Sequence, residues 1–138
     1  MSEIIKDEHS DEWYFAQDSY ILSETDSRGL ILYANDLFCE IAGYKLEELI
    51  GQPHNIVRHP DMPRIAFKGL WDDIQTKGFW TGIVKNQRKD GGYYWVDATA
   101  LRKIHGDGTV TYLSIRRVPN RAHVKSCVAL YSKLKSAE

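Results

Sequence analysis

Two short turn sequences in the second half of the chain restrict its fold more than any other feature. Asp-Gly-Gly at 90–92 and His-Gly-Asp-Gly at 105–108 have the composition of hairpin turns. They separate three runs rich in apolar and aromatic residues, at 80–89, 93–104 and 109–118. Strands joined by hairpins lie antiparallel, so these turns predict an antiparallel sheet over the C-terminal half.

The first half of the chain predicts another hairpin and then helices. Strand-like runs at 20–25 and 30–34 flank the turn formers of 26–29. Cap and stop signals predict helices, at 36–42, 46–50, 64–77 and 121–135. Three prolines interrupt the segment 52–63. Strands grouped apart from helices indicate an α+β fold with one antiparallel sheet and helices over one of its faces.

The length of 138 residues suits one domain. We expect an N-terminal cap segment at 1–18, the domain proper at 19–120 and a C-terminal helix at 121–138. The cap segment is acidic and the segment 119–138 is basic. Two interpretations fit these charges: ends that attract each other or a partner, and two solvated termini.

Composition argues against several classes of function. The net charge of −1 disfavours a nucleic-acid partner, which requires a basic surface. Cys39 and Cys127 are too few for a disulfide scaffold and fit a reducing compartment. No run approaches the roughly 20 apolar residues that span a bilayer, and the N-terminus lacks a secretory signal. We therefore expect a cytoplasmic protein without direct membrane insertion. No nucleophile elbow, Cys-x-x-Cys or phosphate loop occurs, so an enzyme is not expected.

Several short motifs are similar to those of PAS domains. Ala-Asn-Asp-Leu-Phe at 34–38, with Ala-Gly-Tyr at 42–44 and Leu-Glu-Glu-Leu-Ile-Gly at 46–51, resembles the general PAS signature. Asp-Gly-Gly-Tyr-Tyr-Trp-Val at 90–96 resembles the entry to the fourth PAS strand. The resemblance implies a five-stranded antiparallel sheet in the order 2-1-5-4-3, with an N-terminal cap and a C-terminal helix.

Two further segments resemble a narrower group. Residues 51–63 and 80–86 are similar to the PAS domains of aerotaxis receptors and to the stand-alone PAS proteins of bipartite energy-taxis systems. This resemblance implies non-covalent binding of FAD and a report of redox state to a chemotaxis transducer or an adjacent signalling domain. A homodimer, and recruitment to the membrane through a transducer, are compatible with it.

The resemblance assigns Arg58, His59 and Asp61 to FAD or to the support of its pocket. An arginine offers fixed fork donors that suit a pyrimidine oxygen or a phosphate. The alternative is a local turn network in which Asp61 caps the helix that follows. Both interpretations of Asp61 remain open.

Three neighbouring polar residues are also candidates, each with an ordinary structural alternative. His54 would donate to the cofactor or lie outside its contact shell. Asn35 would reach the pocket or act only as a helix N-cap. Asn86 would donate to a ring carbonyl or remain a sheet-surface amide.

Aromatic residues are abundant, and the flat ring of a flavin stacks on aromatic surfaces. The resemblance places Trp80, Phe67 and Trp71 around the cofactor. Filling of the core is the alternative for all of them, and it is the default expectation for Trp71 and Trp95.

The last predicted strand raises a question of register. Val110, Tyr112, Ser114 and Arg116 share one face because side chains alternate along a strand. If this face looks inward, Arg116 ends a buried row and requires an anionic partner. If the register is inverted, Arg117 lies inside.

The function predicted from the sequence is therefore that of an FAD-binding redox sensor, with two rivals. Haem binding requires an axial ligand, for which His54, His59, His105 and His123 are candidates. A cofactor-free interaction module is the second rival. A light sensor that forms a cysteine adduct is not expected, because the stretch comparable to its Asn-Cys-Arg motif reads Asn-Ile-Val-Arg at 55–58.

Overall fold

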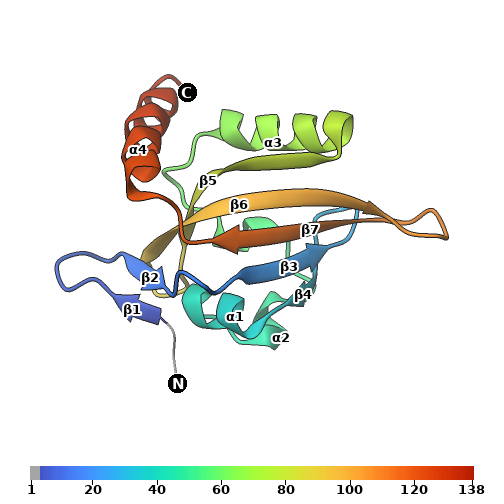
Figure 1. Cartoon of the computed structure of the whole chain (residues 1–138), viewed down its shortest axis with the longest axis horizontal. Helices are drawn as coiled ribbons and strands as arrows, with labels where there is room; N and C mark the ends of the chain where they lie inside the picture. The colour runs from blue at the N-terminus through green and yellow to red at the C-terminus, as the bar shows by residue number, and fades with distance from the viewer. Residues whose placement is uncertain (1–3) are drawn as a thin grey trace.

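The computed structural model describes residues 4–138 and has a five-stranded antiparallel sheet at its centre (Figure 1). Its strands are β3 (Ile21–Thr25), β4 (Ile31–Ala34), β5 (Phe79–Gln87), β6 (Tyr93–Ile104) and β7 (Val110–Arg117). They are arranged in the order β4-β3-β7-β6-β5. Numbered within this sheet alone, that is 2-1-5-4-3, so the predicted sheet order is confirmed.

The predicted hairpins form, and their boundaries differ from the prediction by one or two residues. β5 pairs with β6 from Phe79↔Leu101 to Gln87↔Tyr93. The pairing that the turns do not specify is β3 with β7, which sets Ile21 opposite Arg116. This long-range pair closes the sheet and determines which side chains face the helices.

The helices occur where the cap signals predicted them. They are α1 (Asp36–Ala42), α2 (Leu46–Leu49), α3 (Arg64–Lys77) and α4 (Arg121–Ser136), with one 3-10 turn, η1 (His54–Val57), in the proline-broken segment. Asn35 caps α1, because its Oδ1 accepts from the backbone N–H of Phe38 at 3.1 Å. Gly43 ends α1 in the left-handed region, with φ of 77°.

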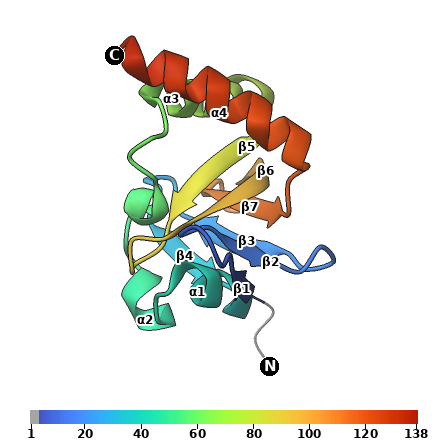
Figure 2. The same ribbon diagram turned by 90° about the vertical axis from the view of Figure 1, so that its left-hand side faces the viewer.

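The core lies between the helices and the inner face of the sheet. α1 and α2 lie at the β3–β4 end of the sheet, and α3 lies along β5 (Figures 1 and 2). The fully buried apolar side chains come from both layers: Ile21, Ile31, Phe38, Ile41, Leu49, Tyr94 and Val96. Such burial is the main source of stability.

The C-terminal helix lies against the opposite face. Trp95 alternates with the inward Tyr94 and Val96, and its ring stacks on Tyr131 of α4 with centroids 6.4 Å apart. The Tyr131 hydroxyl donates to the carbonyl oxygen of Ile83 at 2.7 Å. Trp95 is buried, as the sequence predicted. No helix within residues 4–138 is long and apolar enough to cross a membrane.

The N-terminal segment contains a strand pair that the sequence analysis did not predict. β1 (Ile4–Lys6) pairs with β2 (Trp13–Phe15), and Phe15 belongs to the buried core. Glu12, just before β2, forms an ion pair of 2.9 Å with Arg121 at the start of α4. The charged ends therefore attract each other at this point. The part of the predicted cap at residues 1–3 lies outside the described residues, and the boundary at 18/19 stays a prediction.

Candidate functional site

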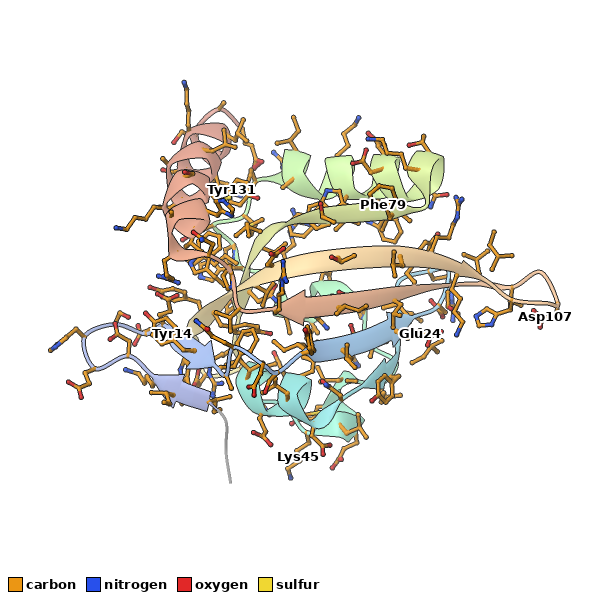
Figure 3. All side chains as sticks on the ribbon, in the orientation of Figure 1. Tyr14, Glu24, Lys45, Phe79, Asp107 and Tyr131 are labelled. Carbon is orange, nitrogen blue, oxygen red and sulfur yellow. The ribbon has the colours of Figure 1, made fainter. Side chains whose placement is uncertain are left out.

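A cavity of about 350 Å³ lies between the sheet and the helical layer. Its walls come from β3, β5, β6 and β7 on one side and from η1 and α3 on the other. Figure 3 shows the side chains as sticks on the ribbon, with Glu24 labelled on β3 and Phe79 on β5, two of the strands that border the cavity. The volume falls in the range of small-molecule sites. Seven of the predicted site residues line it: His54, Arg58, Phe67, Trp71, Trp80, Asn86 and Arg116.

A buried arginine lies at the polar end of this cavity. Arg116 is only 2% exposed, so the inward register of β7 is correct and Arg117 lies outside. Its Nη2 donates to Ser23 Oγ at 2.7 Å, and its Nη1 lies 3.3 Å from His54 Nε2. Its Nε has no hydrogen-bond partner, and within residues 4–138 no carboxylate forms an ion pair with it.

The neighbours of Arg116 determine the protonation of His54. Burial, and then the nearby Arg116 charge, lower the pKa of His54 to about 3. Ser23 Oγ lies 3.1 Å from the same Nε2, which is consistent with a neutral ring that accepts at this nitrogen. Burial lowers the pKa of Arg116 to about 10, so the guanidinium stays charged at neutral pH. Arg116 is therefore a buried cation of the cavity with no ion-pair partner among residues 4–138.

A second polar pair lies where the residue after η1 pairs with β5. Arg58 and Asn86 form an isolated antiparallel bridge, and both line the cavity. The Arg58 guanidinium lies 3.9 Å from the centroid of the Phe67 ring. Asn86 is buried on the inner face, so the sheet-surface alternative for this amide is wrong. Together these residues supply hydrogen-bond groups and a cation along one wall.

Trp80 lies on the cavity wall formed by the sheet, and a neighbouring glycine leaves space for its ring. Trp80 and Gly82 point to the same face of β5, and a Cβ on Gly82 would overlap the six-membered ring of Trp80. The residues opposite them on β6 are Ala100 and Ala98, which also line the cavity. Small side chains thus leave room for a flat indole on this wall.

Trp71 lies at the cavity edge instead of in the core. It is 40% exposed, so the core interpretation of this residue is wrong. Its ring meets Tyr112 edge to face, with centroids 5.3 Å apart. The Tyr112 hydroxyl accepts a hydrogen bond of 3.0 Å from Gln75 Nε2, which fixes this aromatic pair.

Asn35 does not line the cavity. Besides capping α1, its Oδ1 accepts from the Leu22 N–H and its Nδ2 donates to the Tyr20 carbonyl oxygen. These bonds tie α1 to the entry of β3. The N-cap interpretation therefore describes Asn35, because its polar atoms are already engaged.

His59 and Asp61 lie outside the cavity lining and hold the loop that carries Arg58. Asp61 is not the cap of α3, whose N-cap is Pro63; it pairs with Lys85 Nζ at 3.0 Å. The bond from Lys85 lowers the pKa of Asp61. His59 Nδ1 accepts from the Asp61 N–H at 3.0 Å, and burial followed by the Lys85 charge lowers the pKa of His59.

The sequence analysis missed Ser23, Arg28 and the inward hydroxyl of Tyr94. Ser23 alternates with the buried Ile21 and Thr25, so the period of two along β3 is a signal that would have found it. The Tyr94 hydroxyl is buried without a hydrogen bond of normal geometry. Arg28 comes from the tip of the β3–β4 turn, and no local pattern predicts that it lines the cavity.

The histidines offer little to a metal. Among residues 4–138, no three metal-ligating side chains gather. His54 is the one histidine of this stretch that lines the cavity, and its Nε2 faces Ser23 and Arg116. A cation beside that nitrogen disfavours its use as a metal ligand.

Comparisons with known proteins agree with this geometry. A family model described as "PAS fold" matches residues 31–117. The aerotaxis receptor of Escherichia coli is 43% identical over 119 residues, which cover 86% of this chain and 24% of the receptor. The nitrogen fixation regulatory protein of Klebsiella oxytoca is 34% identical over 102 residues, which cover 73% of this chain and 21% of that protein.

A solved PAS domain from Colwellia psychrerythraea has a TM-score of 0.66 at 25% identity, over 74% of this chain and 87% of that one. The chain spans about a fifth to a quarter of the length of the two curated relatives.

Proposed function

This chain belongs to the PAS family, and from that premise we propose that it is a sensor domain that binds FAD in the cavity. It would report the redox state of the flavin to a chemotaxis transducer or an adjacent signalling domain. A cytoplasmic location, with recruitment to the membrane through the transducer, belongs to the same proposal.

The single observation that carries the proposal is the buried, uncompensated charge of Arg116. Burial of a charge without a partner is costly, so such a residue is expected where a ligand completes its environment. A bound flavin would supply reversible electron uptake, with negative charge developing on its ring system. Arg116 would offer its free Nε–H and its positive charge to that ligand.

Other cavity residues fit a flat, polar-edged ring. Asn86 and Arg58 offer donors along one wall, and Trp80 offers an aromatic face. His54, neutral at physiological pH, would keep Arg116 in place without adding charge. His59 and Asp61 would act through the loop that carries Arg58.

The relatives support the signalling part of the proposal. One is an aerotaxis receptor and another is a regulator of nitrogen fixation, and both are longer than this chain. The sequence resemblance to aerotaxis PAS domains implies FAD. A signalling role, without catalysis of its own, is the function that these similarities favour.

The test is an absorbance spectrum of the purified chain, before and after incubation with FAD. We expect bands at about 370 and about 450 nm, and a released flavin that migrates as FAD. A Soret band at about 400 nm would instead support the haem alternative. Protein that stays colourless and takes up no FAD on reconstitution would overturn the proposal and favour the cofactor-free module.

A further inference from the structure

We propose that the open rim of the cavity, formed by Arg28, Trp71 and Tyr112, binds the phosphate and adenine end of the flavin and so selects FAD over shorter flavins. This inference rests on the proposed function, because it assigns a specificity to the same cavity. It concerns the exposed Arg28 and Trp71 and the half-buried Tyr112 at the entrance, whereas Arg116 and Asn86 are buried at the polar end.

The position of the entrance follows from exposure. Arg28 and Trp71 both line the cavity, yet the Arg28 side chain is 76% exposed and Trp71 is 40% exposed. The two residues come from elements far apart in the sequence, the β3–β4 turn and α3. Tyr112, which the Trp71 ring contacts, pairs with Thr25 at the end of β3, next to the β3–β4 turn; α3 itself lies along β5 (Figure 1). The cavity therefore opens to solvent between them.

The chemistry of the rim differs from that of the polar end. Arg28 carries a positive charge at the entrance, held loosely by an exposed ion pair with Asp26 at 3.2 Å. An exposed pair of this kind is weak, so Arg28 can exchange Asp26 for a phosphate at small cost. Trp71, ordered by its contact with Tyr112, offers an aromatic surface for a second flat ring.

The size of the cavity also supports a position for the phosphates and adenine at the rim. If the flavin ring contacts Arg116 and Asn86, the ring and the attached sugar alcohol occupy the enclosed volume of about 350 Å³. The remainder of a dinucleotide, two phosphates and adenosine, then emerges where Arg28 and Trp71 lie. A cation followed by an aromatic ring matches the order of a phosphate followed by a base.

The test compares three ligands that share one ring system: riboflavin, FMN and FAD. Affinities are measured by flavin fluorescence or calorimetry for the whole chain and its variants. Trp71→Ala is expected to lower the affinity for FAD about tenfold or more and to leave FMN and riboflavin within about twofold. Trp71→Phe keeps a flat ring and should retain most of the preference for FAD. Arg28→Ala should weaken FMN and FAD and spare riboflavin.

Two matched variants serve as controls. Phe79→Ala removes an exposed aromatic residue outside the cavity lining, and Arg117→Ala removes an exposed arginine that also pairs with an aspartate. Neither should change any of the three affinities. Equal losses for all three flavins in Trp71→Ala, or no loss of FAD affinity, would overturn the rim assignment while leaving a flavin site. Failure of the unmodified chain to bind any flavin would overturn the proposed function itself.

Discussion

Among single residues, Arg116 places a buried positive charge in the cavity, and this charge lowers the stability of the ligand-free fold. Arg116 stacks its guanidinium 4.4 Å from the Phe38 centroid and donates to Ser23, but it has no anionic partner among the described residues. A hydrophobic side chain of similar length would suit this buried place better. Residues that break the rules of the core in this way are expected at functional sites.

Arg116→Met is therefore expected to stabilise the ligand-free fold by about 1 to 4 kcal/mol and to abolish FAD uptake. Ser23 and His54 can still bond to each other at 3.1 Å in this variant. Urea unfolding and an FAD titration provide the two measurements. Arg117→Met, one residue along on the outer face, should change neither, and a strong loss of stability in Arg116→Met would show that the charge is structural.

The low pKa of His54 predicts how the free energy of unfolding depends on pH. Its pKa is about 3 in the folded chain against an ordinary 6.5, so between these values the unfolded chain binds one more proton. Its contribution to stability is complete above pH 6.5 and is lost as the pH falls towards 3. We expect His54→Gln to remove about 1.4 kcal/mol per pH unit from the slope of unfolding free energy in that window. Urea titrations from pH 7 to 4 measure it, and parallel curves for the two proteins would contradict the buried neutral state.

At the scale of elements, β5 positions both the aromatic and the polar wall of the cavity. One face of β5 carries every second residue of the strand, namely Trp80, Gly82, Val84 and Asn86. On β6, small residues lie opposite Trp80 and Gly82. The bridge from Asn86 to Arg58 then attaches the irregular η1 segment to the same strand. One edge strand thus determines the relative position of three predicted ligand groups.

Gly82→Ala tests this arrangement. The added methyl group overlaps the Trp80 ring, so the variant is expected to lose about 1 to 3 kcal/mol of stability and to displace the indole. FAD affinity should fall with it. In Trp80→Phe the smaller ring leaves space, so Gly82→Ala made in that background should cost much less. Additive losses in this double-mutant cycle would contradict the proposed overlap.

Across the molecule, the N-terminal strand pair contacts the start of α4 on one side of the domain. Glu12 is buried and pairs with Arg121, whose guanidinium also lies 5.6 Å from the Tyr14 ring centroid. The far end of α4 reaches α3, where the Arg64 N–H donates to Glu138 at 2.7 Å. α4 is therefore attached to both the N-terminal strand pair and the helical layer, as a connection between cavity and termini requires.

We expect reduction of bound flavin to change amide hydrogen exchange in residues 54–61 and in at least one terminal segment. The coupling between two sites is typically worth about 1 to 3 kcal/mol, which is enough for a measurable change in protection. Mass spectrometry of oxidised and dithionite-reduced protein gives the result. A response confined to the cavity would contradict an output through the termini.

Arg121→Ala provides the matching perturbation. Loss of its guanidinium leaves Glu12 buried beside Tyr14, so β2 and the start of α4 should exchange faster than in the unmodified chain. FAD affinity should stay within about twofold, because neither residue lines the cavity. Lys68→Ala, which breaks an exposed pair with Asp72, is the control and should leave these segments unchanged.

The helices and strands could be predicted without a structure, because their signals are local. Asn35 and Gly43 bound α1, and the glycine turns at 90–92 and 105–108 join the three long strands. The sheet order was predicted only through the resemblance to PAS domains. Four of the ten predicted site residues, His54, Arg58, His59 and Asp61, could be named for the same reason, since they lie in the contiguous motif at 51–63.

Which of these residues share a cavity depends on packing between distant segments and could not be predicted from local patterns. The pairing of β3 with β7 turned Arg116 inward beside Ser23 and His54, and no local pattern specifies a contact between residues 93 positions apart. Lys85 engaged Asp61 outside the cavity, and exposure placed Trp71 at the rim. Short-range propensity selects helix, strand and turn, whereas the partner of a charge and the burial of a ring depend on packing between distant segments of the chain.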